Sequence, residues 1–502
     1  MKKKIIIPVL ALTSILALGG CGSNGEESKP DSVPASSDSS SEGGEMKGHF
    51  DHKVTIKFVQ SYAQGYQARL QSFVNSFKEI EPNVEINLED GWISGNYDTI
   101  HSQTISDIQT GEYGDLVIAY PDHVVDYIDF GKAVKLDEFM ENSEYGWSES
   151  ERKDLVQAYL REGQEFPIPG TYCLPFSKST EAMFYNETRL FDSELVTFLA
   201  TKGITMNKSY IESLTWEELF GKLCPAFAEY DAAHPTAPLI TPKEDNMNCY
   251  VGYDSDANLF ITLSQQYGYG YTSVDEYGEA HLDYNNDNMK NLMKTFADAS
   301  KKGYLRSPGV IGKSYSSNYF KDNNVLFSIG STAGVKNQAA ETFDVGVARI
   351  PQAAGKDAKI ISQGPSVCIL NHNNDKDRQL AAWLFYKHMT STKNTASWAI
   401  EVGYLPVRAS AYTSEAYSDY CSTEGKDARS AELLTALNAI YSSSTVDSVF
   451  TTPPFKGSSS ARTEVNSLMV NILKDAAEGK TIDDSYLNEK FALAINNTLK
   501  DM

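Results

Sequence analysis

The amino-acid sequence predicts an α/β protein in which mainly parallel sheets are flanked by helices. Strands alternate with helices between residues 54 and 119, and a strand–helix–helix unit follows between residues 361 and 412. This alternation is typical of βαβ units, whose strands pair in parallel. With 502 residues, the chain is long enough for two or three domains with cores of their own.

The first unit begins with an expected strand at residues 54–59, which is followed by a helix. Apolar residues recur in that helix at i, i+3, i+4 and i+7: Leu70, Phe73, Val74 and Phe77. Pro82 ends the helix because proline cannot continue it. Alternating apolar residues at 84–88 predict a second strand, and a helix near 97–109 and a buried strand at 116–119 follow.

The second unit begins at Gly364 and Pro365, which lead into a buried strand at 367–370. In the helix that follows, the apolar residues share one side: Leu380, Ala381, Leu384 and Phe385. A second helix carries Trp398 and stops at Gly403, and Pro406 prevents it from restarting.

Composition excludes some classes of partner. A net charge of −23 argues against a nucleic-acid partner and against adhesion to anionic lipid, because such surfaces require many Lys and Arg residues. The 29 Tyr residues suit polar ligands such as sugars, since tyrosine combines a flat apolar face with a hydroxyl, although most tyrosines simply occupy half-exposed surfaces. The chain offers no complete catalytic motif and no zinc-like cysteine spacing, so we expect no enzyme activity, no cofactor and no metal site.

The N-terminus predicts an export signal with a lipid attachment site. A basic start at residues 2–4 and an apolar run at 5–18 precede Leu-Gly-Gly-Cys, which looks like a bacterial lipobox ending at Cys21. Residues 1–21 are therefore expected to form a lipoprotein signal peptide, with Cys21 acylated and anchored to the membrane. Residues 22–51 are rich in Ser, Gly and acidic residues and predict a flexible tether. The five other cysteines favour buried free thiols, with one disulfide left open.

Polar residues follow two of the expected strands in the first unit. Ser61 and Tyr62 come after the first strand, and Asp122 comes shortly after the strand at 116–119. Ligands of parallel sheets bind beyond the carboxyl ends of the strands, so these residues are expected at the mouth of a cleft.

Several segments resemble the extracellular solute-binding proteins that serve ABC importers, especially the members that bind maltose and glycerol phosphate. The matching segments, in chain order, are GDLVIAYPDHVVDYIDFG (114–131), LPFSKSTEAMFYNETRLF (174–191), YFKDNNVLFSIGSTAGV (319–335), FDVGVARIPQ (343–352), GYLPVR (403–408) and PPFKGSSS (453–460). The resemblance implies a two-lobed, class II periplasmic-binding-protein-like fold with a hinge of three crossings. It places residues 52–175 and 350–398 in the first lobe, and 178–345 and 402–502 in the second.

The resemblance also implies ligand contacts on both lobes and at the hinge. Asp122 matches the family's sugar-binding acid, while the family's nearby aromatic position falls on Ala119. The full set of expected ligand-binding residues is Ser61, Tyr62, Asp122, Ser179, Thr180, Tyr253, Asp256, Ser331, Thr332, Gly364 and Tyr404. Relatives that bind glycerol phosphate carry an Arg shortly after Lys-Gly, where Ser458 and Ser459 stand here, and this difference favours a neutral carbohydrate.

The implied function is capture of a sugar or oligosaccharide outside the cytoplasm and delivery to an ABC permease in the membrane. The protein is expected to be a monomer held at the cell membrane by lipid on Cys21. Three alternatives stay open: a glycerol-3-phosphate or polyol-phosphate binder, a surface adhesin or sensor on the same fold, and a glycosidase that uses a pair of acidic residues.

Overall fold

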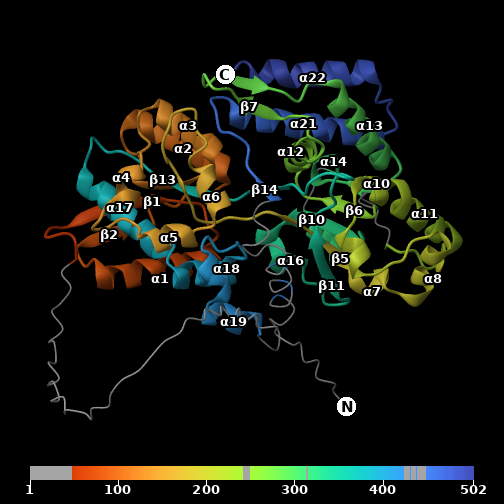
Figure 1. The fold of residues 1–502 in the computed structure, drawn as a ribbon, viewed down its shortest axis with the longest axis horizontal. Helices are drawn as coiled ribbons and strands as arrows, with labels where there is room; N and C mark the ends of the chain where they lie inside the picture. The colour runs from red at the N-terminus through yellow and green to blue at the C-terminus, as the bar shows by residue number, and fades with distance from the viewer. Residues whose placement is uncertain are drawn as a thin grey trace, which may run out of the picture. The chain divides into compact units, whose positions relative to one another are not determined.

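The computed structural model describes residues 48–240, 249–311, 315–422, 430, 433, 437 and 448–502. Cys21 and nearly all of the expected tether lie outside the described residues. The described part contains two five-stranded sheets with helices around them, and each sheet combines two parallel with two antiparallel strand pairs (Figure 1). The predicted α/β class is therefore confirmed. Among the described helices, none is both long enough and apolar enough to span a bilayer.

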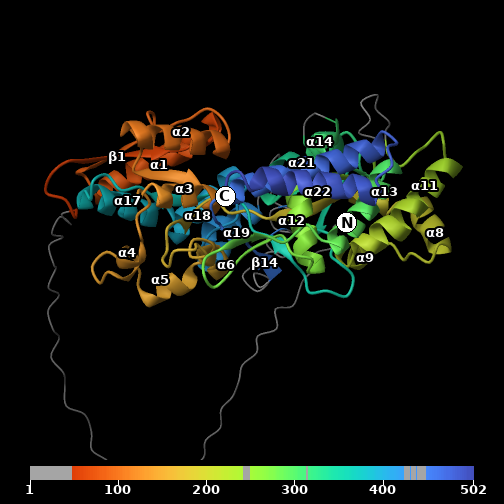
Figure 2. The same ribbon diagram turned by 90° about the horizontal axis from the view of Figure 1, so that it is seen from above.

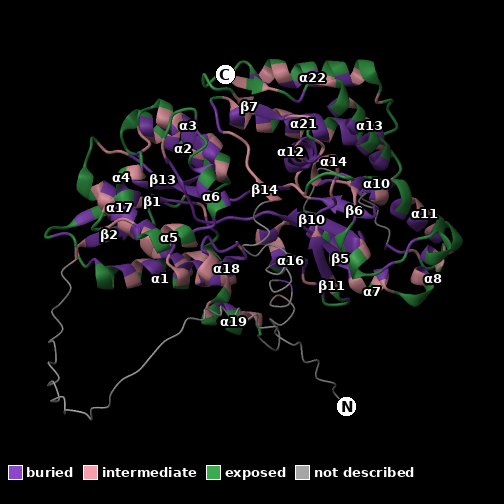
Figure 3. Ribbon diagram, in the orientation of Figure 1, coloured by how far each residue is buried: buried purple, intermediate pink, exposed green. Residues whose placement is uncertain are grey.

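The first sheet joins strands from distant parts of the chain. In spatial order they are β2 (Val84–Asn87), β1 (Val54–Val59), β3 (Leu116–Ala119), β13 (Ser366–Ile369) and β4 (Leu174–Pro175). Strand β1 pairs in parallel with β2 and β3, whereas β13 runs antiparallel to β3 and β4. β3 and β13 are buried along their whole length because helices cover the sheet (Figure 3), which explains their continuous apolar sequences.

Helices surround this first sheet. They are α1 (Gln64–Ile80), α2 (Tyr97–Thr110), α3 (Pro121–Asp129), α4 (Asp137–Glu141), α5 (Glu149–Asp154), α6 (Gln157–Glu162), α17 (Lys376–Met389) and α18 (Thr392–Val402). α1 buries Leu70, Phe73 and Phe77. α18 ends at Gly403, as the sequence predicts. Gly403 has a φ of 83°, a left-handed conformation that glycine adopts readily.

The second sheet is built in a similar way around a different core. Its spatial order is β11 (Val345–Arg349), β5 (Glu181–Asn186), β10 (Phe327–Ser331), β6 (Val251–Tyr253) and β9 (Leu305–Arg306). β6 lies parallel to β10 and β9, and β5 runs antiparallel to β10 and β11. β10 ends at Ser331, so Ser331 belongs to the strand.

Helices and turns surround this second sheet. They are α7 (Glu187–Leu190), α8 (Ser193–Thr201), α9 (Lys208–Glu212), α10 (Trp216–Glu218), η1 (Leu219–Leu223), α11 (Cys224–Ala233), α12 (Asp256–Tyr267), α13 (Asp287–Lys301), α14 (Pro308–Ile311), α15 (Ser316–Phe320), η2 (Thr332–Gly334), α16 (Val335–Gln338), η3 (Ala409–Thr413), α19 (Glu415–Cys421), α21 (Ser458–Ala477) and α22 (Asp484–Thr498). α21 and α22 lie side by side (Figures 1 and 2), and both contribute to the core of the second sheet. A small hairpin joins β7 (Thr272–Val274) and β8 (Ala280–Leu282).

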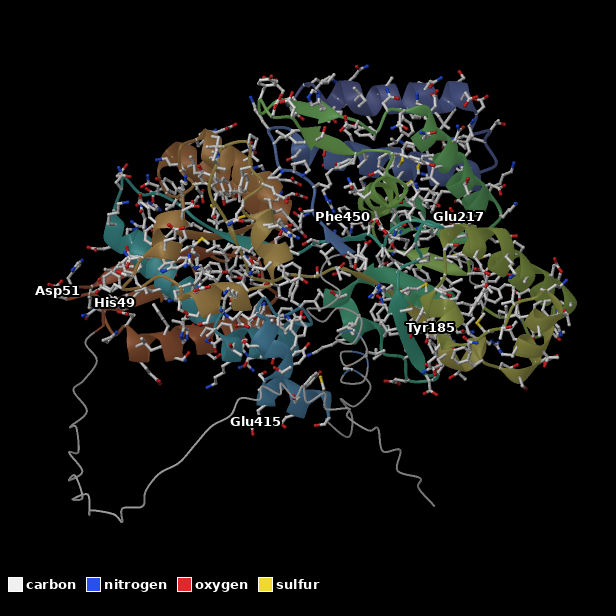
Figure 4. The ribbon with its side chains drawn as sticks, in the orientation of Figure 1. His49, Asp51, Tyr185, Glu217, Glu415 and Phe450 are labelled. Atoms are coloured by element: carbon white, nitrogen blue, oxygen red, sulfur yellow. The ribbon has the colours of Figure 1, made fainter. Side chains whose placement is uncertain are left out.

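The chain passes between the two sheets after β4, after β11 and after α18, and these crossing segments touch. Ser179 and Gln363 exchange two backbone hydrogen bonds of 2.8 Å, and the Leu405 amide donates to the Lys178 carbonyl at 2.7 Å. Nearby, β12 (Ile360–Ile361) pairs in parallel with β14 (Val449–Phe450), and Figure 4 labels Phe450 at this point. These contacts bring together residues from all three crossings, while the exact lobe boundaries stay a prediction.

Candidate functional site

Two neighbouring cavities lie among residues from both sheet regions. Their volumes are about 480 Å³ and about 410 Å³, and both are lined by Tyr120, Ser255 and Arg462. We call the two together the cleft. Other residues that line it include Asn96, Tyr97, Asp98, Asp122 and His123 from α2 and α3, Glu181, Asp254, Asn258, Tyr315, Ser331, Gln338 and Gln363 from the second sheet region and a crossing, and Ser459, Thr463 and Asn466 from α21.

The cleft lies where several helices begin. α2, α3, α12 and α21 each contribute residues of their first turn or N-cap to its lining. The Asn96 and Ser255 side chains cap α2 and α12 by accepting hydrogen bonds from backbone N–H groups. The first turn of a helix leaves other N–H groups without partners inside the helix, so this lining offers donors to ligand oxygens.

Tyrosine rings form an aromatic wall on the α2–α3 side of the cleft. The rings of Tyr97 and Tyr120 meet edge to face, with centroids 5.2 Å apart. The Tyr404 hydroxyl lies 2.8 Å from the Tyr97 hydroxyl, directly behind this wall. Ala119, where the family resemblance places an aromatic residue, is fully buried, and the next residue, Tyr120, supplies an aromatic ring to the lining.

A chain of hydrogen bonds runs through the opposite wall. The Arg462 guanidinium donates to Asn258 Oδ1, and the Asn258 amide donates to Glu181 Oε1 at 2.8 Å. The Tyr253 hydroxyl donates to the other oxygen of the same carboxylate. Because Asn258 is only 3 % exposed, this chain fixes the position of its side chain and thereby holds Arg462 against the cleft.

Burial changes the proton affinity of two acids in this wall. It raises the pKa of Glu181 to about 7, although the hydrogen bonds from Tyr253 and Asn258 act in the opposite direction. Burial likewise raises the pKa of Asp254 to about 6, against the lowering effect of hydrogen bonds from Ser316. In the described part of the chain, no group of three His, Cys, Asp or Glu side chains is arranged to hold a metal ion.

A family model described as bacterial extracellular solute-binding protein matches residues 72–423, which is more than half of the chain. The chain belongs to this family. Its members are extracellular binding proteins, and their location places this solute-binding protein outside the cytoplasm. No curated protein sequence matches the chain.

Solved structures with the same fold cover most of this solute-binding protein. The GacH receptor of Streptomyces glaucescens is 17% identical with a TM-score of 0.63, and the match covers 90% of this chain and 100% of that one. UgpB from Mycobacterium tuberculosis, solved in complex with glycerophosphocholine, is 16% identical with a TM-score of 0.63, and the match covers 89% of this chain and 100% of that one. Lmo0181 from Listeria monocytogenes, solved in complex with cycloalternan, is 15% identical with a TM-score of 0.64, and the match covers 90% of this chain and 100% of that one. These likenesses establish the two-lobed fold of the solute-binding protein.

Two of the ligand-binding residues expected from sequence line the cleft. Asp122 lies in the first turn of α3, and Ser331 ends β10 opposite Glu181 of β5. Tyr404 stands behind Tyr97, and Gly364 follows the cleft residue Gln363. Ser61 is half-buried just after β1, next to Gln60, which pairs with Trp92.

Six other expected residues are buried, and their side chains bond within the protein or lie against it. The Tyr62 hydroxyl shares a hydrogen bond with Ser177, and the Thr180 hydroxyl donates to the Ile361 carbonyl. Thr332 Oγ1 accepts from the Thr180 amide, and Asp256 accepts from the Ser307 hydroxyl at 2.6 Å. The Tyr253 hydroxyl donates to the cleft residue Glu181, and Ser179 bonds through its backbone to Gln363. None of these six is among the residues that line the two cavities, so their direct contact with ligand stays a prediction.

Sequence reasoning did not select several residues that line the cleft, above all Arg462, Tyr97 and Gln338. Arg462 stands three and four residues after Ser459 and Ser458, so it occupies the same face of α21 one turn further on. That spacing was the available signal. Gln338 is 2 % exposed, and its Oε1 atom has no hydrogen-bond partner among the described residues. Such an oxygen beside a cavity is suited to accept from a ligand hydroxyl.

The raised pKa of Glu181 predicts a pH dependence of stability. Glutamate in an unfolded chain titrates near pH ~4.3. The folded protein holds this proton up to about pH 7, so the free energy of unfolding should fall as pH rises between those values and level off above them. The contribution is on the order of 3 kcal/mol. Denaturant unfolding at pH 5, 6, 7 and 8 measures how the free energy of unfolding changes with pH. This change should be smaller for Glu181→Gln than for the parent, whereas the exposed control Glu85→Gln should show the same change as the parent.

Proposed function

We propose that this protein is the substrate-binding lipoprotein of an ABC importer and that it captures a sugar or oligosaccharide in the cleft. The observation that supports this most directly is the make-up of the cleft: a tyrosine wall faces carboxylate, amide and hydroxyl groups on the other sheet region. Aromatic faces pack against the apolar faces of sugar rings, and the polar groups bond their hydroxyls.

The lobes are proposed to close around the ligand, because a ligand that contacts both sides binds the closed form more tightly. Tyr120 and Asp122 would hold it from the first lobe, and Ser331 and Gln338 from the second. A membrane permease would then receive the ligand from the closed form. Lipid on Cys21 and the tether at 22–51 would keep the protein, as a monomer, at the outer face of the membrane.

A second candidate ligand is a glycerol phosphate or related polyol phosphate. Arg462 supports it, because the guanidinium lines both cavities and is a strong partner for phosphate. Asp98, Asp122 and Asp254 line the same cleft and oppose an anion there, so a neutral carbohydrate is the preferred proposal.

The test is a thermal-shift screen against mono- and oligosaccharides and glycerol phosphates, followed by calorimetry on variants. Asp122→Asn should weaken carbohydrate binding about 10-fold, because a charged hydrogen bond contributes about 1.5–3 kcal/mol. Tyr404→Phe should weaken it about 5-fold, through loss of the hydroxyl that supports Tyr97. Asp129→Asn, at the exposed end of the same helix as Asp122, is the control.

Three results would count against the proposal. If Asp122→Asn and Tyr404→Phe bind as tightly as the parent, these residues do not hold the ligand. Stabilisation by glycerol phosphates alone would select the second candidate instead. Release of products from an oligosaccharide, followed by chromatography, would show an enzyme.

A further inference from the structure

Trp92 is an exposed indole held in a fixed position. The side chain is 47% exposed, whereas the other four tryptophans, at 147, 216, 383 and 398, are at most 4% exposed. The Gln60 amide donates to the Gly91 carbonyl at 2.9 Å, and the Ile93 amide donates to the Gln60 carbonyl at 2.8 Å. The indole N–H itself donates to the Tyr62 carbonyl at 3.1 Å. The backbone on both sides and the indole N–H are therefore anchored, while about half of the residue stays exposed to solvent.

The position of Trp92 also depends on a glycine beside it. A Cβ atom at Gly91 would lie 1.9 Å from the Phe58 carbonyl oxygen, closer than any real contact. The loop after β2 can therefore approach β1 this closely only with glycine at 91. This close approach puts Trp92 next to the start of α1, at the edge of the first sheet.

Trp92 forms one side of a groove of about 590 Å³, and α1 forms the other side. The lining residues are Gln64, Gln67, Ala68 and Gln71 from α1, and Leu88, Glu89 and Trp92 from the loop. The four α1 positions follow the i, i+3, i+4, i+7 spacing of one helix face. Gln67 is held in place by bonds to Gln60 and to the Tyr62 carbonyl, and Gln71 donates to Asn75.

The chemistry of the groove suits an uncharged, hydroxyl-rich ligand. It combines one aromatic ring with three amide side chains: Gln64 and Gln71 can each donate and accept hydrogen bonds, whereas both N–H groups of Gln67 already bond within the protein and leave its oxygen as an acceptor. Glu89 is its one charged residue, on a chain whose net charge is −23. A basic protein partner would meet more carboxylates elsewhere on the surface, and an anionic ligand would meet no Lys or Arg among the lining residues.

We propose that the groove formed by Trp92 and the α1 glutamines is a second carbohydrate-binding site, outside the cleft. A pyranose ring packs its apolar face on the exposed indole, and the glutamine side chains bond its hydroxyls. The groove shares no lining residue with the cleft, so it holds a separate sugar unit of a long chain or a separate chain. Such a site would keep a polymeric glycan near a tethered binding protein.

Tryptophan fluorescence tests this directly because Trp92 is the exposed tryptophan. The full-length mature protein is titrated with maltoheptaose, cellohexaose, xylohexaose and mannohexaose, with acrylamide quenching measured at each point. Binding by at least one of them should shift the emission to the blue and reduce quenching. The Trp92→Phe variant should lose both signals, yet calorimetry should show its groove affinity reduced only about 3-fold because an aromatic face remains.

Variants distinguish sugar binding in this groove from binding elsewhere on the surface. Trp92→Ala should weaken groove binding about 10-fold and Gln71→Ala about 3-fold, whereas Tyr277→Ala, which removes another exposed aromatic side chain (82% exposed), should change nothing. Arg462→Met, in the cleft, should leave the Trp92 signal intact. The proposal is overturned if none of the four oligosaccharides protects Trp92. It is equally overturned if Trp92→Ala impairs uptake by the permease without changing oligosaccharide binding, which would make the groove a protein contact.

Failure of this proposal is distinguishable from failure of the proposed function. Cleft binding is measured by the Asp122→Asn comparison, and groove binding by the Trp92 signal. A protein that binds sugar in the cleft but gives no Trp92 protection keeps its proposed function and lacks the second site.

Discussion

Replacing Lys178 by Met is expected to lower the free energy of unfolding by about 3–5 kcal/mol, because it leaves a buried carboxylate without its cation. The Lys178 side chain has no solvent exposure, and its ammonium group donates to the Glu162 carboxylate and, at 2.8 Å, to the Gly364 carbonyl. Methionine fills nearly the same volume but carries no charge. Chemical denaturation at pH 7 measures the change directly.

Two further variants separate the lost charge from a change in packing. The double variant Lys178→Met, Glu162→Gln should recover much of the lost stability, since replacing both partners removes the unpaired charge. Lys153→Met removes an exposed ion pair with Glu149 and should cost less than about 1 kcal/mol. A loss of less than about 1 kcal/mol for Lys178→Met would show that Glu162 does not depend on the buried ammonium.

The stability lost by the Lys178→Met variant should also depend on pH. Burial raises the pKa of Glu162 above its ordinary value, and Lys178 opposes that shift by attraction. Once the lysine is gone, Glu162 is expected to hold its proton to still higher pH. The Lys178→Met variant should therefore lose least at acidic pH, where a neutral Glu162 is buried at lower cost, and most at neutral pH and above.

The position of Lys178 explains why its loss matters beyond one ion pair. Lys178 lies on the first crossing and Gly364 on the second, while the Lys178 carbonyl accepts from Leu405 on the third. Gly364 has a φ of 82°, and a Cβ there would lie 1.9 Å from the Ser177 carbonyl oxygen. The crossings are thus packed backbone against backbone, and the buried Lys178 ammonium ties them to Glu162 of α6.

The elements of the fold could be predicted from sequence because their signals are local. The helix over residues 97–109 and the helix stop at Gly403 are both present, since apolar spacing and glycine each act within a few residues. Strand order was not visible in this way. β13 lies between β3 and β4, so it pairs with strands that are far away in the sequence. The periodicity of apolar residues carries no information about such pairing.

The candidate site was predictable only in part, and the reason is physical. Asp122 comes three residues after the end of β3, in the first turn of α3, and lines the cleft beyond the sheet edge. Thr180 and Thr332 also stand at strand ends, but their hydroxyls bond to neighbouring crossing or strand residues, because buried polar groups require partners. Arg462 reaches the cleft from α21, near the end of the chain, so only the folded arrangement reveals its place beside Tyr120.

Replacing Arg462 by Met is expected to weaken ligand binding about 100-fold, or about 3 kcal/mol. The guanidinium lines both cavities of the cleft and is the charged donor there that α21 supplies. Its loss removes charge-assisted hydrogen bonds to ligand oxygens, which are about twice as strong as neutral ones. It also leaves Asn258 Oδ1 without its donor, so the amide that bonds Glu181 is no longer held in one orientation. Calorimetry with the ligand found by the thermal-shift screen measures the effect.

The control for Arg462 is Lys474→Met, which removes a positive charge from the exposed far end of the same helix and should leave affinity unchanged. Unfolding curves are measured for both variants, because Arg462→Met also leaves the buried Asn258 Oδ1 without its donor and is expected to cost some stability. The size of the affinity loss also distinguishes the two candidate ligands. A glycerol phosphate should lose more affinity than a neutral sugar, because the binding of its negative charge depends on the guanidinium. The affinity that remains for the glycerol phosphate should no longer fall when salt is added. If Arg462→Met binds the neutral ligand within about 3-fold of the parent, the guanidinium does not contact the ligand, and the tyrosine wall and Asp122 alone would have to hold it.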